Sequence, residues 1–339
     1  MTASWQERVS LKPYNTFGID VCARYFTQAH DDGEVRQALA EAAEWQVPVL
    51  VIGGGSNLLL TGDIDALVLH MASRGRRVMQ EDGDRVVVEA EAGEPWHPFV
   101  QWSLEQGFCG LENLSLIPGT VGAAPMQNVG AYGVEIKDVF AGLTALDRET
   151  GELRDFALDE CAFAYRDSLF KRNPGRWLIL RVRFALSRTL RAHLDYGPVR
   201  QRLAEQGVEA PTAKAISEAI CSIRREKLPD PAELGNAGSF FKNPVVPAAV
   251  AERIREHYPN VVAYPQPDGQ VKLAAGWLIE QAGWKGYRDG DAGVHRLQSL
   301  VLVNYGQATG AQLHDLARRI QADIFERFGV VLEMEPNLY

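Results

Sequence analysis

The chain has 339 residues, of which 46% are hydrophobic and 23% are charged. A chain of this length and composition predicts two or three folding units with sizeable cores. Its formal net charge of -9 disfavours binding to nucleic acid and to anionic membranes, so an anionic ligand would need a local basic pocket.

The sequence also predicts a cytoplasmic protein. Residues 1–7 contain neither the basic segment nor the apolar segment of a secretory signal. Apolar runs such as residues 47–52 are far shorter than the about 20 residues that span a bilayer. The cysteines form no CxxC pair and no Cys/His cluster, and we expect reduced, mostly buried thiols rather than disulfides. They are Cys22, Cys109, Cys161 and Cys221.

Hydrophobic periodicity predicts a mixture of helices and strands in the first two-thirds of the chain. The first helix has Asp31 or Asp32 available as its N-terminal cap. Glu149-Thr150-Gly151 separates two strands that should form a hairpin. The predicted helices are 32–45 and 97–106, and the predicted strands are 47–52, 67–69, 85–90, 143–146, 153–158 and 177–186.

The character of the sequence changes after about residue 222. Residues 227–231, Lys-Leu-Pro-Asp-Pro, are typical of a domain linker. Three helices are predicted beyond it, and the last has a continuous apolar stripe. The helices are 248–258, 273–282 and 312–328, and the stripe consists of Leu313, Leu316, Ile320, Ile324 and Phe328. A β-rich first two-thirds followed by a smaller α/β third predicts a mixed α+β fold.

Gly53-Gly54-Gly55-Ser56-Asn57 directly follows a predicted strand. Glycine permits a positive φ and a close approach of the backbone, and successive N–H groups can bind an anion such as a phosphate. The segment is not a P-loop, because no Gly-Lys-Ser/Thr follows. It is not a Rossmann fingerprint either, because Leu58 occupies the third glycine position. Taken alone, a plain tight turn is the commoner interpretation.

A second glycine-rich segment, residues 117–133, is more informative. It contains four glycines and three alanines, which leaves little side-chain bulk and many free amides. Gln127 and Asn128 can hydrogen-bond the edge of a flat heteroaromatic ring. Long loops without a function are uncommon in compact domains. Two such segments in one β-rich domain suggest a dinucleotide lying across it.

Six blocks of sequence in a fixed order carry a specific resemblance. They are Asn15-Thr16-Phe17-Gly18-Ile19, residues 53–57, residues 118–133, Ala164-Tyr165-Arg166-Asp167-Ser168, residues 235–244 and Leu332-Glu333-Met334-Glu335. Together they resemble the UDP-N-acetylenolpyruvoylglucosamine reductase family in its longer, type I form. The resemblance implies an FAD-binding domain of the vanillyl-alcohol-oxidase (PCMH) type in two subdomains, 1–72 and 73–222. It also implies a smaller α/β substrate-binding domain, 223–335, with residues 336–339 as a candidate addition to the first subdomain.

The resemblance implies reduction of UDP-N-acetylglucosamine enolpyruvate to UDP-N-acetylmuramate, a cytoplasmic step of peptidoglycan precursor synthesis. In the implied reaction, NADPH would reduce FAD and leave, and the same pocket would then admit the substrate. Hydride would reach the terminal methylene carbon, and a proton would reach the carbon that bears the ether oxygen. The implied FAD contacts are Gly53, Gly54, Gly55, Ser56, Asn57, Pro118, Gly119, Thr120, Gly122, Ala123, Gln127, Asn128, Gly130, Ala131 and Tyr132.

Three residues are implied to act in catalysis. Arg166 would stabilise the charge that develops on the substrate carboxylate, although a lone arginine is more often part of a surface salt bridge. Glu335 would help only if it is protonated or shares a proton, because an ionised carboxylate repels that charge, and Glu333 is expected to be its solvated neighbour. Ser239 would donate the proton; outside this motif it would be an ordinary loop serine.

The resemblance also implies a set of substrate contacts. Lys227 and Tyr196 would meet the diphosphate, Asn243 and Gln298 the carboxylate or sugar, and Tyr132, Tyr264 and Lys272 the sugar and uridine, with Tyr165, Arg166 and Ser239 completing the site. Tyr196 lies in a segment, residues 194–197, that is expected to move when the substrate binds. Lys171, Arg172 and Arg176 match no such contact and are expected on a solvated face.

Two other functions stay open at this point. One is a different flavin enzyme of the same fold, such as an alcohol oxidase that reacts with oxygen. The other is a sugar-nucleotide-binding module without redox chemistry. The histidines show no metal-ligand spacing, and we expect no metal. The expected partners are the UDP-sugar and NADPH, without nucleic acid or membrane, and the protein is expected to be a monomer.

Overall fold

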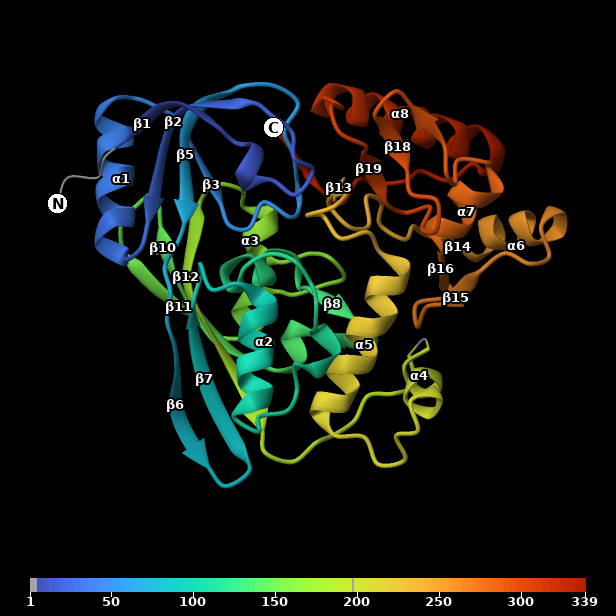
Figure 1. Cartoon of the computed structure of the whole chain (residues 1–339), viewed down its shortest axis with the longest axis horizontal. Coiled ribbons are helices and arrows are strands. Elements are labelled where there is room, and N and C mark those ends of the chain that lie inside the picture. The colour runs from blue at the N-terminus through green and yellow to red at the C-terminus, as the bar shows by residue number, and fades with distance from the viewer. Residues whose placement is uncertain (1–4, 197) are drawn as a thin grey trace. The chain divides into compact units, whose positions relative to one another are not determined.

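The structure, a computed structural model, describes residues 5–196 and 198–339 (Figure 1). Residues 1–4 and Gly197 lie outside this part. The expected absence of a secretory signal rests partly on residues 1–4, and Gly197 belongs to the predicted substrate loop. The chain divides into two compact units. The first is Met1–Val9, Ala23–Gly54 and Asp65–Glu226, and the second is Ser10–Cys22, Gly55–Ile64 and Lys227–Tyr339. The division into three domains stays a prediction.

The first unit begins with a four-stranded sheet and one helix, α1. The strand order is β1-β2-β5-β3, with β3 and β5 parallel. Val35, Ala38 and Ala42 form the buried face of α1. Asp31 caps this helix, since its side chain accepts a hydrogen bond from the Glu34 N–H at 2.9 Å. The elements are α1 (Asp32–Glu44), β1 (Gln6–Ser10), β2 (Cys22–Ala29), β3 (Val49–Ile52) and β5 (Ile64–Met71).

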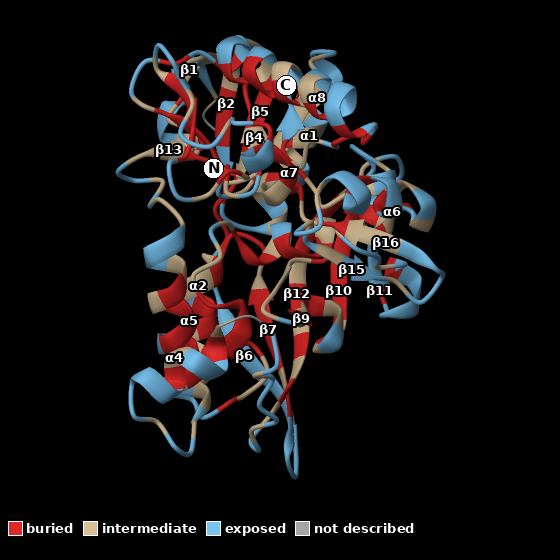
Figure 2. Ribbon diagram, turned by 90° about the vertical axis from the view of Figure 1, so that its right-hand side faces the viewer, coloured by how far each residue is buried: buried red, intermediate tan, exposed pale blue. Residues whose placement is uncertain are grey.

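A five-stranded antiparallel sheet forms the larger core of the first unit. Its order is β11-β10-β12-β7-β6, and β10 and β11 form the predicted hairpin. Phe184 of β12 packs against Trp96 and Phe99 of α2, with ring centroids 5.9 and 5.3 Å away. Buried residues line β10 and β12, whereas β6 is exposed along its length (Figure 2). The elements are β6 (Arg76–Asp82), β7 (Arg85–Glu91), α2 (Trp96–Glu105), β10 (Phe140–Asp147), β11 (Leu153–Phe156) and β12 (Trp177–Ser187).

Two helices of the first unit, α4 (Val199–Glu205) and α5 (Ala213–Lys227), were not expected from the sequence. Helix α5 buries Ile216, Ile220 and Ile223, which have helical spacing. Its start is marked by Thr212, whose hydroxyl accepts a hydrogen bond from the Ala215 N–H at 3.2 Å. The helix continues past residue 222, where Ile223 is the last residue of this apolar stripe and the exposed residues that follow it are charged.

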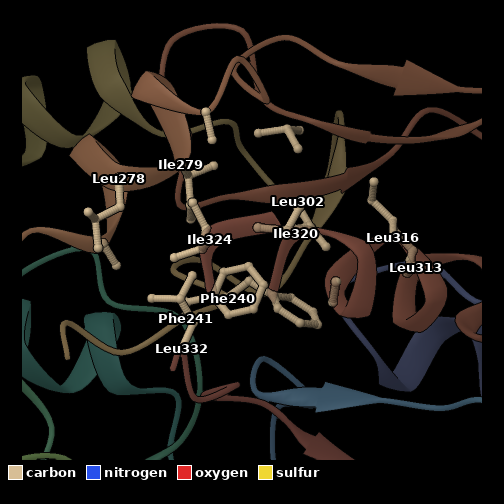
Figure 3. Packing of buried hydrophobic residues seen from close by; sticks show 14 of the residues in the cluster. Phe240, Phe241, Leu278, Ile279, Leu302, Leu313, Leu316, Ile320, Ile324 and Leu332 are labelled. Carbon is tan, nitrogen blue, oxygen red and sulfur yellow. The ribbon is translucent and has the colours of Figure 1, made fainter. Parts of the chain in front are cut away.

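The second unit packs three helices against two small sheets with orders β13-β19-β18-β17 and β14-β16-β15. Its core contains Phe240 and Phe241 together with the whole predicted stripe of the last helix (Figure 3). That helix begins two residues earlier than predicted, because Thr309 and Gln312 form a capping box. The elements are β13 (Gly235–Asn236), β14 (Val245–Pro247), α6 (Ala248–His257), β15 (Ala263–Pro265), β16 (Gln270–Leu273), α7 (Ala275–Gln281), β17 (Arg288–Asp289), β18 (Ala292–Val294), β19 (Leu302–Asn304) and α8 (Gly310–Phe328).

Two segments from the start of the chain belong to the second unit. The Asn304 side chain donates a hydrogen bond to the Phe17 carbonyl at 2.9 Å. Strand β4 (Leu58–Leu59) pairs in parallel with β20 (Asn337–Leu338). Residues 336–339 therefore return to a strand that directly follows the first glycine-rich segment.

All four cysteines are free thiols in the structure. Cys161 and Cys221 are buried, and Cys22 and Cys109 are half-buried. Burial raises the pKa of the Cys161 thiol to about 12, which makes it a poor nucleophile. Within the described residues, no helix is both long and apolar enough to cross a membrane. The same residues contain no group of three His, Cys, Asp or Glu side chains that could hold a metal ion.

Candidate active site

The two glycine-rich segments, which are distant in sequence, lie against each other in the first unit. A Cβ atom added to Gly53 would lie 2.5 Å from Thr120 Oγ1, and one added to Gly54 would lie 3.0 Å from the Gly119 Cα atom. Both distances are shorter than an ordinary contact, so a side chain at either position would force its neighbour to shift. Glycine at these positions therefore lets the two backbones lie in direct contact. Gly54 is also exposed, and an exposed backbone without side chains is one that the phosphates of a dinucleotide can approach closely. These residues therefore fit FAD.

The remaining residues predicted to contact FAD continue along the second segment. This segment is not a plain loop, because it contains a 3-10 helix, η3 (Val121–Gln127), and a short ribbon of β8 (Gly130–Ala131) and β9 (Val134–Glu135). Pro118 and Ala123 are exposed. Gly122 lies so close to Ala92 that an added Cβ atom would be 2.5 Å from the Ala92 Cβ. Glycine at this position thus lets η3 lie directly on the sheet.

The end of the first glycine-rich segment belongs to the second unit. Gly55 has a φ of +62°, and an added Cβ atom would lie only 1.9 Å from the Tyr14 carbonyl oxygen. Ser56 is half-buried. Asn57 donates from Nδ2 to the Glu335 carbonyl at 3.3 Å, and its own carbonyl accepts from the Asn337 N–H at 3.0 Å. This turn therefore holds the backbone of a predicted catalytic residue.

In the first unit, four hydrogen bonds join the second glycine-rich segment to the Tyr165–Arg166 turn and the helix that follows it, α3 (Leu169–Arg172). Three of them use a backbone carbonyl as acceptor, so they fix the path of both segments. The bonds run from Ser168 Oγ to Met126 O (2.7 Å), from Asn128 Nδ2 to Ala164 O (3.2 Å), from Arg166 Nη2 to Gly130 O (3.0 Å) and from Lys171 Nζ to Gln127 Oε1 (3.4 Å).

Asn128 lies at the centre of this network. It has no exposed surface, and its Oδ1 accepts from the Lys137 N–H at 3.2 Å while its Nδ2 donates to Ala164. Both ends of the amide are thus engaged with the protein. The observed contribution of Asn128 is to hold the segment, and its contact with FAD stays a prediction. Gln127 is half-buried and bonded to Lys171.

Arg166 stands in a tight turn closed by paired backbone hydrogen bonds between Ala164 and Asp167, of 3.0 and 3.2 Å. Its φ of +54° is unusual for a residue with a side chain. The guanidinium lies 5.5 Å from the centre of the Tyr165 ring. Lys171 donates to the Arg166 carbonyl at 3.1 Å. Lys171 is half-buried, so the expectation that it lies on a solvated face was wrong.

Sequence reasoning missed Arg224, which lies beside the predicted ligand residue Tyr132. Arg224 projects from α5, donates from Nε to the Leu116 carbonyl at 3.2 Å, and forms a side-chain hydrogen bond with Tyr132. Burial raises the pKa of the Tyr132 hydroxyl, and Arg224 partly opposes this. Burial likewise lowers the pKa of Arg224. The apolar stripe of α5 was the only signal that could have identified this residue.

His97 supports the start of the same segment and gives a pH prediction. Its Nδ1 accepts from the Leu116 N–H at 3.0 Å, which requires an unprotonated Nδ1. Burial lowers the pKa of His97, and the charges of Arg225 and Arg224 lower it further. The unfolded chain binds a proton near the ordinary histidine pKa, at a higher pH than the folded protein does. Stability should therefore fall as the pH drops through that region.

We expect the thermal midpoint to fall between about pH 7 and pH 5, and His97→Gln to reduce this fall. Glutamine keeps an acceptor for Leu116 but does not titrate in this range. The measurement is the midpoint at a series of pH values, with the exposed His257→Gln as the control. Parallel profiles for wild type and His97→Gln would contradict the prediction.

Ser239 and Glu335 lie on neighbouring segments of the second unit. The Glu335 N–H donates to the Phe240 carbonyl at 2.8 Å, and Phe241 forms a β-bridge with Met334. The side chains of Phe240 and Phe241 point into the core (Figure 3), which leaves the Ser239 side chain exposed. Glu335 is half-buried. The two predicted catalytic residues are thus one residue apart across a pair of hydrogen-bonded segments.

Glu333 occupies the solvated position that was predicted for it. It is exposed and forms a salt bridge with Lys242 at 2.8 Å. Only Met334 separates Glu333 from Glu335, but of the two glutamates only Glu335 is joined through its backbone to Asn57 and Phe240. The two glutamates therefore differ in their surroundings, since Glu333 is exposed and Glu335 is half-buried.

The predicted substrate contacts of the second unit form two pairs. Tyr264 of β15 is the direct cross-strand neighbour of Lys272 of β16. Asn243 Oδ1 accepts from the Ala275 N–H at 3.0 Å, and an added Cβ on Gly276 would lie 3.5 Å from Gln298 Oε1. Asn243 and Gln298 therefore share the first turn of α7.

Two further residues were predicted to contact the substrate. Lys227 is exposed at the C-terminal end of α5, and Tyr196 is exposed in the first unit, near Gly133. The predicted residues thus fall into local groups. Arg166 and Tyr132 belong to the first unit, and Ser239 and Glu335 to the second.

Comparisons with known proteins cover the whole chain. The family pattern of the UDP-N-acetylenolpyruvoylglucosamine reductase C-terminal domain matches residues 230–339, and that of an FAD binding domain matches residues 23–157. The UDP-N-acetylenolpyruvoylglucosamine reductase of Pseudomonas putida is 84% identical over 339 residues, which is 100% of both chains. The chain belongs to the UDP-N-acetylenolpyruvoylglucosamine reductase family. The family's members in Pseudomonas aeruginosa and Chromobacterium violaceum are 68% and 55% identical, over 100% and 99% of each chain.

Solved structures agree with this membership. The crystal structure of UDP-N-acetylenolpyruvylglucosamine reductase from Thermus caldophilus matches with a TM-score of 0.67 and 25% identity, over 99% of this chain and 100% of that one. A solvent-stable cholesterol oxidase matches with a TM-score of 0.50 and 13% identity, over 98% and 86% of the chains, and shows the fold alone. The predicted α+β fold with an FAD-binding domain of the vanillyl-alcohol-oxidase type is confirmed.

Proposed function

We propose that Arg166, Ser239 and Glu335 carry the reduction of UDP-N-acetylglucosamine enolpyruvate to UDP-N-acetylmuramate. As a member of its family, the chain is an FAD-dependent oxidoreductase that acts in peptidoglycan precursor synthesis, with NADPH as the reductant. When bound, FAD supplies the two-electron chemistry, taking a hydride from NADPH and giving it to the terminal carbon of the enolpyruvyl double bond. The chain's own residues supply binding, charge stabilisation and a proton.

Arg166 is proposed to bind the substrate carboxylate. Negative charge grows on this carboxylate as hydride reaches the terminal carbon, and a guanidinium stabilises the charge more strongly as it grows. The turn that carries Arg166 is held by Ala164, Asp167 and Lys171. The guanidinium itself donates from Nη2 to the Gly130 carbonyl at 3.0 Å, which helps to orient it before the reaction begins, as electrostatic stabilisation of a transition state requires.

Ser239 is proposed to donate the proton to the carbon that bears the ether oxygen. A hydroxyl is a weak acid in water, but the carbon is strongly basic once the hydride has been added, and a positioned donor gains greatly from proximity. The observation that carries this proposal is the hydrogen bond from Glu335 N–H to Phe240 O, which sets Glu335 beside Ser239. In its protonated form, Glu335 would add a second hydrogen-bond donor for the developing charge.

We expect Glu335→Gln to slow substrate reduction about tenfold or more while the rate of flavin reduction by NADPH changes little. The amide has the size of a protonated carboxyl but cannot share its proton, so the fold should be kept. Single-turnover absorbance at the flavin band measures both half-reactions. Glu333→Gln is the matched control, since loss of its exposed salt bridge with Lys242 should cost at most about 1 kcal/mol of stability. Equal rates in wild type and Glu335→Gln would contradict the prediction.

The proposal includes the setting in which the enzyme works. We propose a cytoplasmic monomer whose ligands are the UDP-sugar and NADPH, with no nucleic acid or membrane partner. The negative charge of the chain supports the last point. Cell fractionation and light scattering test the location and the oligomeric state.

The proposed reaction is tested by following where the new hydrogens appear in the product. FAD-loaded enzyme, NADPH and the enolpyruvyl UDP-sugar are mixed in D2O, and the product is examined by NMR. We expect deuterium at the carbon that bears the ether oxygen, and one deuterium in the new methyl group as well, because the hydrogen that reduced flavin holds on nitrogen exchanges with solvent before the substrate enters. Product without deuterium at the carbon that bears the ether oxygen, or no product, would overturn the proposal.

A further inference from the structure

Asn113 ties together two segments that carry predicted ligand tyrosines, both in the first unit. It lies in a short 3-10 helix, η2 (Glu112–Leu114), and is only 1% exposed. Its Nδ2 donates to two backbone carbonyls, Tyr132 O and His193 O, each at 2.9 Å. Its Oδ1 has no hydrogen-bond partner among the described residues. The hydrogen bonding of the side chain therefore consists of these two links.

Tyr132, at one end of this link, is held firmly. Its backbone carbonyl is bound by Asn113, and its hydroxyl is hydrogen-bonded to Arg224, which also binds the Leu116 carbonyl. Its ring packs on the small core of α4 and α5. A residue fixed at its backbone, its ring and its hydroxyl can act as a rigid wall of a binding site.

His193, at the other end, belongs to an irregular segment, residues 188–196, that leads to Tyr196. Leu190 and Leu194 pack on the same small core as Tyr132. Tyr196 itself is 58% exposed. It lies beside Gly133, where an added Cβ atom would be 3.2 Å from the Tyr196 Cβ. The segment is thus anchored just before Tyr196 and is solvated at Tyr196.

We propose that Asn113 is a positioning residue that sets the distance between Tyr132 and the Tyr196 segment and so determines the affinity for the nucleotide-sugar. The amide has two N–H groups, and each satisfies one carbonyl. Its loss frees both carbonyls and lets the segment move away from Tyr132. This inference rests on the proposed role of Tyr196 in binding the substrate diphosphate. The position of the segment itself can be measured without that role.

The test compares Asn113→Ala with wild type in the FAD-loaded enzyme. We expect KM for the enolpyruvyl UDP-sugar to rise about tenfold, which corresponds to about 1.4 kcal/mol. FAD content and the rate of flavin reduction by NADPH should stay within about twofold of wild type. In a Tyr196→Ala background the same substitution should cost little, because the residue through which it acts is already gone. Hydrogen exchange across residues 190–196 should be faster in Asn113→Ala, before any ligand is added.

Asn304→Ala is the matched control. Asn304 is also a buried asparagine whose Nδ2 donates to two backbone carbonyls, those of Phe17 and Ala308, but it lies in the second unit. It should lower stability without speeding exchange at residues 190–196. An unchanged KM, or an equal penalty with and without Tyr196, would overturn the proposal. Faster exchange in an enzyme that does not turn over the enolpyruvyl sugar would support the link and count against the proposed function alone.

Discussion

Ser239→Ala is expected to slow reduction of the enolpyruvyl UDP-sugar by about 10²–10⁴-fold, which is the usual contribution of a positioned general acid. Flavin reduction by NADPH should be almost unchanged, because that step needs no proton at the sugar carbon. Ser239 is exposed while its two neighbours, Phe240 and Phe241, are buried. Removal of its hydroxyl should therefore leave the core intact. Stopped-flow absorbance of the flavin measures the two half-reactions separately.

Ser239→Cys provides a sharper comparison, because a thiol keeps a transferable proton at the same position. We expect it to recover part of the rate that alanine loses. If alanine slows both half-reactions equally, Ser239 has a structural role and no role as the acid. If alanine leaves the substrate half-reaction at its wild-type rate, the proton has another source.

Gly55→Ala is expected to destabilise the protein by about 2–4 kcal/mol, the sum of a strained backbone and a forced displacement. The φ of Gly55 is +62°, and the new methyl group would lie 1.9 Å from the Tyr14 carbonyl oxygen. The methyl group and the Tyr14 oxygen cannot move apart without a shift of the backbone, because the Thr16 N–H also donates to the Gly55 carbonyl at 3.1 Å. Because the turn continues into the bare backbone at Gly53 and Gly54, FAD occupancy should fall as well.

Urea unfolding and the ratio of flavin to protein absorbance measure the two effects. Gly62→Ala is the control, since it lies a few residues further on with open space around it and no positive φ. It should change neither quantity appreciably. A Gly55→Ala protein as stable as the control would show that the turn can relax, contrary to the expectation.

Most of the fold could be predicted from the sequence where one local signal dominates. The stripe from Leu313 to Phe328 predicted α8 because a buried helical face needs apolar residues at that spacing. Helix α5 was missed although Ile216, Ile220 and Ile223 have the same spacing. No helix was predicted in this part of the chain, and in the structure these isoleucines pack against Val199 and Leu203 of α4.

The sequence predicts residues for the candidate site, but it could not predict how they lie relative to one another. The glycine-rich segments identified a bare backbone, yet their contact through Gly54 and Gly119 depends on strands that meet only in the fold. Asn128 and Lys171 show the same limit. An amide and an amine in a motif can face a ligand or the protein, and their partners, the carbonyls of Ala164 and Arg166, are set by a turn of unusual backbone conformation.

The most direct test of the account is the absorbance of the flavin in the purified protein, followed without oxygen. We expect a flavin spectrum that bleaches when NADPH is added and recovers when the enolpyruvyl UDP-sugar follows. Recovery only on admission of oxygen would instead indicate an oxidase of the same fold. A protein that shows no flavin absorbance and binds no added FAD would contradict the account altogether.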